Sequence, residues 1–109
     1  MLGLIREIDE ADTPELFVVR PQTRENAMTV DELEEIGITI DSMSAAVKRS
    51  HRGWLHEDSG RVCGFAMGDS ENAEVTVMAV LPEYEGKGIG GELLTRVESW
   101  LHAEGCQRI

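Results

Sequence analysis

A glycine-dense turn between a valine-rich strand and an amphipathic helix constrains this sequence more than any other feature. The stretch VMAVLPEYEGKGIGGELLTRVESWL, residues 77–101, places Gly86, Gly88, Gly90 and Gly91 within six positions. Glycine loses more conformational entropy on folding than any other residue and is unfavourable inside a helix. We therefore expect the backbone amides of this turn to come very close to a ligand.

Hydrophobic periodicity predicts a domain that mixes helices and strands. Strands are expected at residues 2–8, 54–57, 62–68 and 74–81, and helices at 14–20, 29–37, 43–50 and 89–101. The strand at 74–81 is rich in valine and carries no charge after Glu74. A strand of that kind is typical of the middle of a sheet, so we expect it to lie centrally and to be buried on both faces.

Composition limits the classes of function. Twenty-one acidic and ten basic side chains give a formal net charge of −11, which argues against general nucleic-acid binding because that needs a basic surface. No apolar run approaches the roughly 20 residues that span a bilayer, and the N-terminus does not resemble a signal peptide. Cys63 and Cys106 cannot form a disulfide framework, and His51, His56 and His102 fit no common metal spacing. We expect a cytoplasmic protein with no metal and no nucleic-acid or membrane partner.

Three phosphate-binding motifs could explain the glycine turn. A Walker A loop is excluded because no Gly-Lys-Ser/Thr ends it. Gly86-x-Gly88-x-x-Gly91 satisfies the dinucleotide fingerprint formally, but that fingerprint needs an acidic residue about 20 positions further on, beyond the sequence. The third motif is a site for the pyrophosphate of an acyl-CoA, because a helix N-terminus offers unpaired amides and a positive dipole.

The stretch VLPEYEGKGIGGELL resembles the signature of the GNAT family of N-acetyltransferases, Gln/Arg-x-x-Gly-x-Gly/Ala after a strand that ends in Val-x-Pro. Gly88 and Gly90 match the two signature glycines, and residues 80–82 match the strand exit. Glu85 occupies the Gln/Arg position of the signature and so departs from the pattern. A carboxylate at this position is electrostatically unfavourable beside a pyrophosphate. The resemblance implies an α/β (α+β) fold: a mixed, largely antiparallel sheet flanked by helices in the order β-α-α-β-β-β-α.

The resemblance also implies a site and a reaction. The co-substrate would be acetyl-CoA, and the acceptor would be an amine of a small molecule or of a protein. The residues implied to bind acetyl-CoA are Met78, Ala79, Val80, Gly86, Lys87, Gly88, Ile89, Gly90 and Gly91. The backbone of 78–80 would pair with the pantetheine arm as an added strand would. Glu74 is the possible general base, acting through water as in some family members; alternatively it is a carboxylate in solvent at the start of a strand.

The family pattern continues beyond this sequence with a fifth strand, a fourth helix and a closing hairpin, and that helix usually carries a tyrosine that protonates the departing thiolate. The final letters CQRI resemble the start of the fifth strand, and Tyr84 precedes the turn, where it is badly placed as the acid. We therefore expect residues 1–109 to be a single acyl-CoA N-acyltransferase-like domain that is C-terminally incomplete and has weak or no catalysis. The alternative is a truncated non-catalytic CoA-binding or dimerising module. The exposed strand edge predicts a homodimer, a swapped assembly or a separate C-terminal piece.

Overall fold

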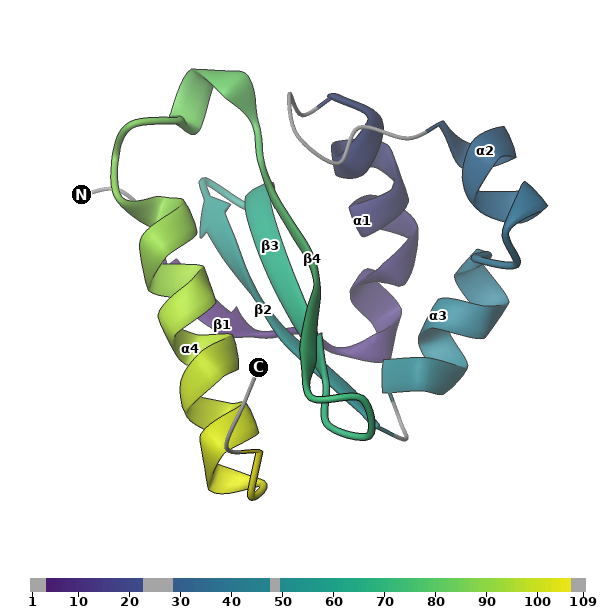
Figure 1. The fold of residues 1–109 in the computed structure, drawn as a ribbon. Coiled ribbons are helices and arrows are strands. Elements are labelled where there is room, and N and C mark those ends of the chain that lie inside the picture. The colour runs from purple at the N-terminus through teal and green to yellow at the C-terminus, as the bar shows by residue number, and fades with distance from the viewer. Residues whose placement is uncertain (1–3, 23–28, 48–49, 107–109) are drawn as a thin grey trace.

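The computed structural model describes residues 4–22, 29–47 and 50–106. Its helices and strands are, in chain order, β1 (Leu4–Glu7), α1 (Thr13–Val19), α2 (Val30–Glu35), α3 (Ile40–Val47), β2 (His51–Asp58), β3 (Arg61–Asp69), β4 (Glu74–Val80) and α4 (Ile89–Ala103). Figure 1 shows how they are arranged. The predicted strand residues 2 and 3, and residues 107–109 of the expected fifth strand, lie outside the described residues.

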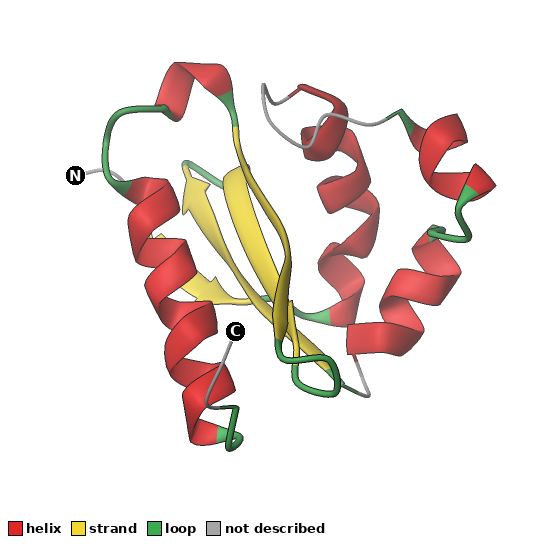
Figure 2. Cartoon of the chain, viewed as in Figure 1, coloured by secondary structure: helices red, strands yellow, loops and turns green. Residues whose placement is uncertain are grey.

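The four strands form one antiparallel sheet in the order β1-β2-β3-β4, so each strand pairs with its neighbour along the chain. The helices α1, α2 and α3 lie on one side of this sheet and α4 lies on the other (Figure 2). The predicted fold class, a largely antiparallel sheet flanked by helices, is confirmed. The first connection has three helices, as the hydrophobic pattern predicts, whereas the order implied by the family resemblance has two. Thr29 and Glu32 cap α2 reciprocally through two hydrogen bonds of 3.1 Å.

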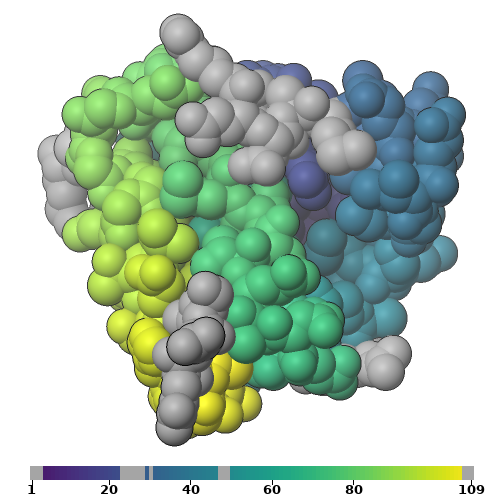
Figure 3. Space-filling view, viewed as in Figure 1, coloured from purple at the N-terminus to yellow at the C-terminus, as the bar shows by residue number. Residues whose placement is uncertain are grey.

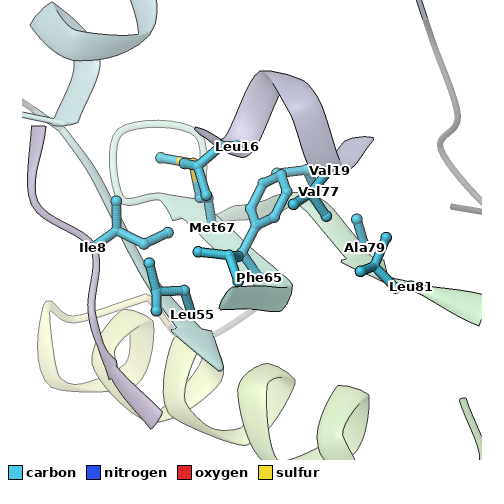
Figure 4. Close-up of a cluster of buried hydrophobic side chains, with 10 residues drawn as sticks. Ile8, Leu16, Val19, Leu55, Phe65, Met67, Val77, Ala79 and Leu81 are labelled. Atoms are coloured by element: carbon cyan, nitrogen blue, oxygen red, sulfur yellow. The ribbon is translucent and has the colours of Figure 1, made fainter. Parts of the chain in front are cut away.

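The main hydrophobic core fills the space between α1 and the sheet. Its buried side chains are Ile8, Leu16, Val19, Leu55, Val62, Phe65, Met67, Val77, Ala79 and Leu81. Figure 4 shows how α1 and the strands contribute to this cluster. Burying each large aliphatic or aromatic side chain contributes about 1.5–3 kcal/mol, so this face supplies much of the stability of the fold.

The second core lies between the sheet and α4. Ile89, Leu93, Val97 and Leu101 recur every four residues along α4 and are all buried, which confirms the apolar face predicted from the sequence. Gly68 of β3 lies beneath this helix. A Cβ atom at Gly68 would come within 2.7 Å of Val97 Cγ1, so the missing side chain allows α4 to pack directly on the strand.

The prediction that the strand at 74–81 is central and buried on both faces is wrong. The strand with helices over both faces is β3, in which every residue from 62 to 69 is buried. In β4, Glu74 and Thr76 are exposed, and one side of the strand has no partner strand among the described residues. The valine-rich pattern arises because β4 contributes side chains to both cores while lying at the edge of the sheet.

A β-bulge interrupts the pairing of β3 with β4. Met67 lies opposite Val77 and Gly68 lies opposite Val75, so Thr76 is an extra residue without a register partner. Its hydroxyl donates to the carbonyl of Met67 at 3.3 Å. A bulge of this type bends the strand and increases its twist.

Candidate acyl-CoA site

The glycine turn reverses the chain between the end of β4 and the start of α4. A short 3-10 turn at Pro82–Tyr84 follows β4, and the amide of Tyr84 donates to the carbonyl of Leu81 at 2.9 Å. Gly86 and Gly88 then adopt positive φ values of 76° and 81°. Side chains disfavour this left-handed conformation, so the path of the turn itself requires glycine at these two positions.

Gly88 is the N-cap of α4, and no side chain caps this helix end. The first intrahelical hydrogen bond runs from the amide of Glu92 to the carbonyl of Gly88 at 3.1 Å. The amides of Ile89, Gly90 and Gly91 therefore have no acceptor within the helix. Together with the positive end of the dipole of a 15-residue helix, they form a favourable position for an anion.

These amides open onto a pocket of about 370 Å³. Its lining consists of Met78, Val80, Tyr84, Glu85, Gly86, Gly88, Ile89, Gly90 and Gly91. The structure thus brings together all of the predicted acetyl-CoA-binding residues except Ala79 and Lys87. In the space-filling view of Figure 3, the turn and α4 border the segment that contains β4 on the face toward the viewer.

The structure separates Ala79 from its neighbours in β4. The side chain of Ala79 is buried in the core beneath α1. The amide of Leu81 donates to the carbonyl of Cys63 at 2.8 Å, and because peptide groups alternate along a strand, those of Ala79 also face β3. The peptide groups of Met78 and Val80 face away from β3, toward the side on which the pocket lies. A ligand that pairs with this edge would therefore meet Met78 and Val80 and not Ala79.

Tyr84 ties the turn to the β2–β3 hairpin. Its hydroxyl donates to Oδ2 of Asp58 at 3.0 Å, and Arg61 lies 3.8 Å from the carboxylate of Glu83 beside it. The Cys63 thiol and the Asp58 carboxylate next to the phenol raise the pKa of Tyr84 to about 12. Tyr84 therefore stays protonated at neutral pH and helps to hold the turn in place. The sequence did not indicate that it would line the pocket, because its partner Asp58 is distant in the chain.

The family of the chain is decided by its sequence match over this whole fold. Residues 5–109 match the model of the acetyltransferase (GNAT) family. This chain belongs to the GNAT family. The resemblance predicted from residues 77–94 is thereby confirmed for nearly the full length.

Solved structures share the fold of this GNAT chain at low sequence identity. PaiA N-acetyltransferase from Thermoplasma acidophilum, in complex with coenzyme A, has a TM-score of 0.77 and 18% identity, with 97% of this chain and 76% of that chain covered. The ribosomal-protein-S18-alanine N-acetyltransferase from Escherichia coli has a TM-score of 0.72 and 17% identity, covering 96% and 63%. AAC(6')-Iy with a bisubstrate analogue of CoA has a TM-score of 0.71 and 17% identity, covering 99% and 77%.

The predicted base of this GNAT chain lies far from the glycine turn. Glu74 is exposed at the first position of β4, opposite Asp69 in the register. The length of β4 separates it from Val80 by about 20 Å, at roughly 3.3 Å per residue. A ligand that extends along β4 from the pocket would approach Glu74. The role of Glu74 as a base depends on such a ligand and stays a prediction.

The turn that precedes Glu74 is ordered around a buried carboxylate. Asp69 accepts hydrogen bonds from the Glu71 amide at 2.9 Å and from the Asn72 side chain at 2.6 Å. Burial alone would raise the pKa of Asp69, but these hydrogen bonds and the nearby His51 outweigh it and hold the pKa below its ordinary value. Asp69 therefore stays ionised and fixes the hairpin from which β4 begins.

Two further findings concern the described part of the GNAT chain. Among the residues described, no helix combines the length and apolarity that a membrane-spanning helix needs. Within the same ranges, no group of three or more histidine, cysteine, aspartate or glutamate side chains could hold a metal ion.

Proposed function

We propose that this GNAT chain is an acetyl-CoA-dependent N-acetyltransferase whose glycine turn binds the pyrophosphate of acetyl-CoA. The observation that carries the proposal is the uncapped N-terminus of α4, which presents backbone amides to a pocket lined by Gly86, Gly88, Gly90 and Gly91. A pyrophosphate needs close donors and positive potential, and this arrangement provides both without a basic side chain. The exposed Glu85 at the pocket is tolerable because the donors are backbone groups.

The pantetheine arm is expected to run from the turn along the outer side of β4. The peptide groups of Met78 and Val80 face that side and can pair with the amides of the arm, as in the addition of a strand. An arm in this position leads the thioester away from the turn and toward the N-terminal half of β4. The acetyl group would then lie between the pocket and Glu74.

The reaction would be direct transfer of the acetyl group. The amine nitrogen attacks the thioester carbonyl, a C–N bond forms, the C–S bond breaks, and the thiolate takes up a proton. A backbone amide of β4 would polarise the carbonyl, and much of the rate would come from holding amine and thioester together. Glu74 would accept the proton of the amine through a water molecule.

The acceptor is proposed to be an amine of a small molecule or of a protein. The neighbours in fold include a ribosomal-protein-alanine N-acetyltransferase and AAC(6')-Iy bound to an analogue that contains acetylneamine. The net charge of −11 favours the approach of a cationic amine, whether it belongs to a small molecule or to a protein.

Binding of acetyl-CoA and release of CoA thiol, measured on one sample with several amines, test this proposal. Binding with turnover supports the enzyme, whereas binding without turnover for any amine supports the alternative, a non-catalytic CoA-binding module. Absence of binding contradicts both. Glu74→Gln should lower turnover and remove its dependence on pH on the basic side while leaving acetyl-CoA affinity nearly unchanged. Unchanged turnover across pH would exclude the role of Glu74.

We further propose that a second copy of the chain pairs with β4 when acetyl-CoA is absent. β4 lies at the edge of the sheet in the described residues, and an edge strand of this kind invites pairing with another chain. Because the pantetheine arm would use the same edge, acetyl-CoA should dissociate such a dimer. Light scattering with and without acetyl-CoA tests this, and a monomer at high concentration without acetyl-CoA contradicts it.

We propose that the protein is located in a reducing compartment, the cytoplasm. Cys63 is a buried free thiol, and Cys106 lies apart from it with its sulfur 3.6 Å from the carbonyl oxygen of Ser70. Neither cysteine is used as a cross-link, which is typical of cytoplasmic proteins. Localisation of a tagged full-length protein tests this assignment.

A further inference from the structure

A second groove lies on the other side of the glycine turn, between the start of α4 and the strands β1 and β2. Its volume is about 550 Å³, and Gly88 and Ile89 line both this groove and the pocket described above. The backbone at the head of α4 is therefore a wall that the two hollows share. A ligand held at the first can extend into the second without leaving the protein surface.

Two cationic side chains line this groove. Lys87 comes from the turn and Arg96 comes from the second turn of α4. Arg96 forms no ion pair with any described residue, and Lys87 lies over the ring of Tyr84, whose centroid is 5.8 Å from Nζ. In a chain with a net charge of −11, two cations without carboxylate partners beside one hollow indicate an anionic ligand.

A buried histidine supplies an independent observation. His56 of β2 lines the groove, although only 5% of its surface is exposed. Its Nδ1 atom is buried and has no hydrogen-bond partner. Leaving a buried polar atom without a partner is costly, so the wall of the groove contains a polar group whose hydrogen bonding the protein leaves unsatisfied.

We propose that this groove binds the 3′-phosphate of coenzyme A. The inference rests on the proposed function, because it assumes that the pyrophosphate occupies the glycine turn. Coenzyme A carries its remaining phosphate on the ribose next to the pyrophosphate, so this group must lie close to the head of α4. Arg96 can hold a phosphate through two parallel hydrogen bonds, and Lys87 adds a second charge.

The groove also contains a group that opposes this ligand. Glu92 lies on the same face of α4 as Arg96, four residues before it, and lines the groove. Its carboxylate repels a phosphate, so its removal should strengthen binding while removal of Arg96 should weaken it. Two substitutions on one helix face are thus expected to act in opposite directions.

The test compares coenzyme A with 3′-dephospho-coenzyme A by calorimetry. The parent protein should bind coenzyme A about tenfold more tightly, the usual effect of a charge-assisted pair. Arg96→Gln should remove this preference by weakening coenzyme A alone, and Glu92→Gln should increase it. Arg52→Gln is the matched control, because it removes the same charge from an exposed arginine stacked on Trp100, outside the groove.

The possible outcomes separate the two proposals. Equal affinities of the parent protein for both compounds, or a preference that survives in Arg96→Gln, overturn this inference and leave the proposed function intact. Failure of both compounds to bind overturns the proposed function and, with it, this inference. Inorganic phosphate at matched ionic strength is the third probe. If its binding depends on Arg96 while the two cofactor forms bind alike, the groove is a site for free phosphate and the inference is wrong.

Discussion

Two glycines that meet the same helix are present for opposite reasons. Beneath α4, a Cβ atom at Gly68 would lie 2.7 Å from Val97 Cγ1 and 3.3 Å from Leu101 Cδ1. At the head of α4, a Cβ atom at Gly88 would meet no atom within 4 Å. The contacts of the protein therefore explain Gly68, whereas Gly88 is explained by its backbone conformation and by the open space around it. The comparison teaches that packing within the chain requires the first glycine, whereas backbone conformation requires the second and leaves open space beside it.

Gly91 sharpens this contrast. It lies inside α4, so its backbone is helical, and a Cβ atom there would meet nothing within 4 Å. Alanine would stabilise a helix at such a position by about 1 kcal/mol relative to glycine. Neither conformation nor packing in the described structure accounts for glycine at Gly91. The proposed pyrophosphate would account for it, and the predictions below separate the effect of the fold from that of the ligand.

The largest effect on stability is expected for Gly68→Val. The new side chain would collide with Val97 and Leu101, and overpacking of this kind costs about 3 kcal/mol. Urea denaturation followed by circular dichroism measures the loss. An unchanged free energy of unfolding would show that α4 can move away from β3 without penalty, and the packing explanation of Gly68 would be wrong.

Gly88→Glu should abolish binding of acetyl-CoA, with a loss of at least about a hundredfold in affinity, or about 3 kcal/mol. The substitution strains the backbone at a φ of 81° and places a carboxylate where the pyrophosphate is proposed to bind. Gly37→Glu is the matched control, because Gly37 also has a positive φ, 86°, and open surroundings but follows α2. Calorimetry that finds equal affinities for the two variants would exclude the turn as the pyrophosphate site.

Gly91→Ala should raise the free energy of unfolding and lower the affinity for acetyl-CoA. The gain in stability is expected to be about 1 kcal/mol from helix propensity. The loss of affinity follows if the methyl group occupies space that the phosphates need. A variant that is more stable and binds acetyl-CoA as tightly as the parent would show that Gly91 is not reserved for the ligand.

The smallest effect concerns the support of the turn by Tyr84. Tyr84 is the single tyrosine of the chain, so its ionisation can be followed by ultraviolet absorbance. We expect a pKa of about 12, compared with about 10 in the unfolded chain. Because the folded state favours the neutral phenol, its contribution to stability is complete below pH 10 and is lost as the pH rises toward 12. Asp58→Asn should lower the pKa toward 10, and an unchanged pKa would contradict the role of Asp58.

The sequence was sufficient to predict most elements, the turn and the family, because these depend on local patterns. The four-residue repeat from Ile89 to Leu101 and the glycine spacing can be read within one segment. The edge position of β4 could not be predicted from composition, because a strand that contributes to two cores has the same composition as a central strand. An exposed edge was expected only from the family pattern, and the structure shows that β3 is the strand covered by helices on both faces.

The second groove could be predicted only in part. The family resemblance implies that Lys87, which lies in the turn, binds the cofactor. Arg96 follows Ile89 by two helical turns, so helical periodicity predicts that the two residues share a face of α4. In the sequence, His56 is one of three histidines that fit no common metal spacing. Its burial beside the head of α4 depends on the register of β2 with β1 and β3, which pairs it with Ile5 and Gly64. No local pattern indicates that register.

The bulge at Thr76 has a consequence for sequence comparison within the family. Thr76 is the residue of β4 that can be deleted while the pairs of β3 with Val75 and Val77 are kept in register. A one-residue gap at this position would therefore leave the ladder and both cores intact, and selection for folding alone should permit it. If homologous sequences lack such gaps, the extra residue is retained for the bend that it gives to β4. The shape of the strand edge along which the pantetheine arm is proposed to bind would then be under selection separately from the stability of the sheet.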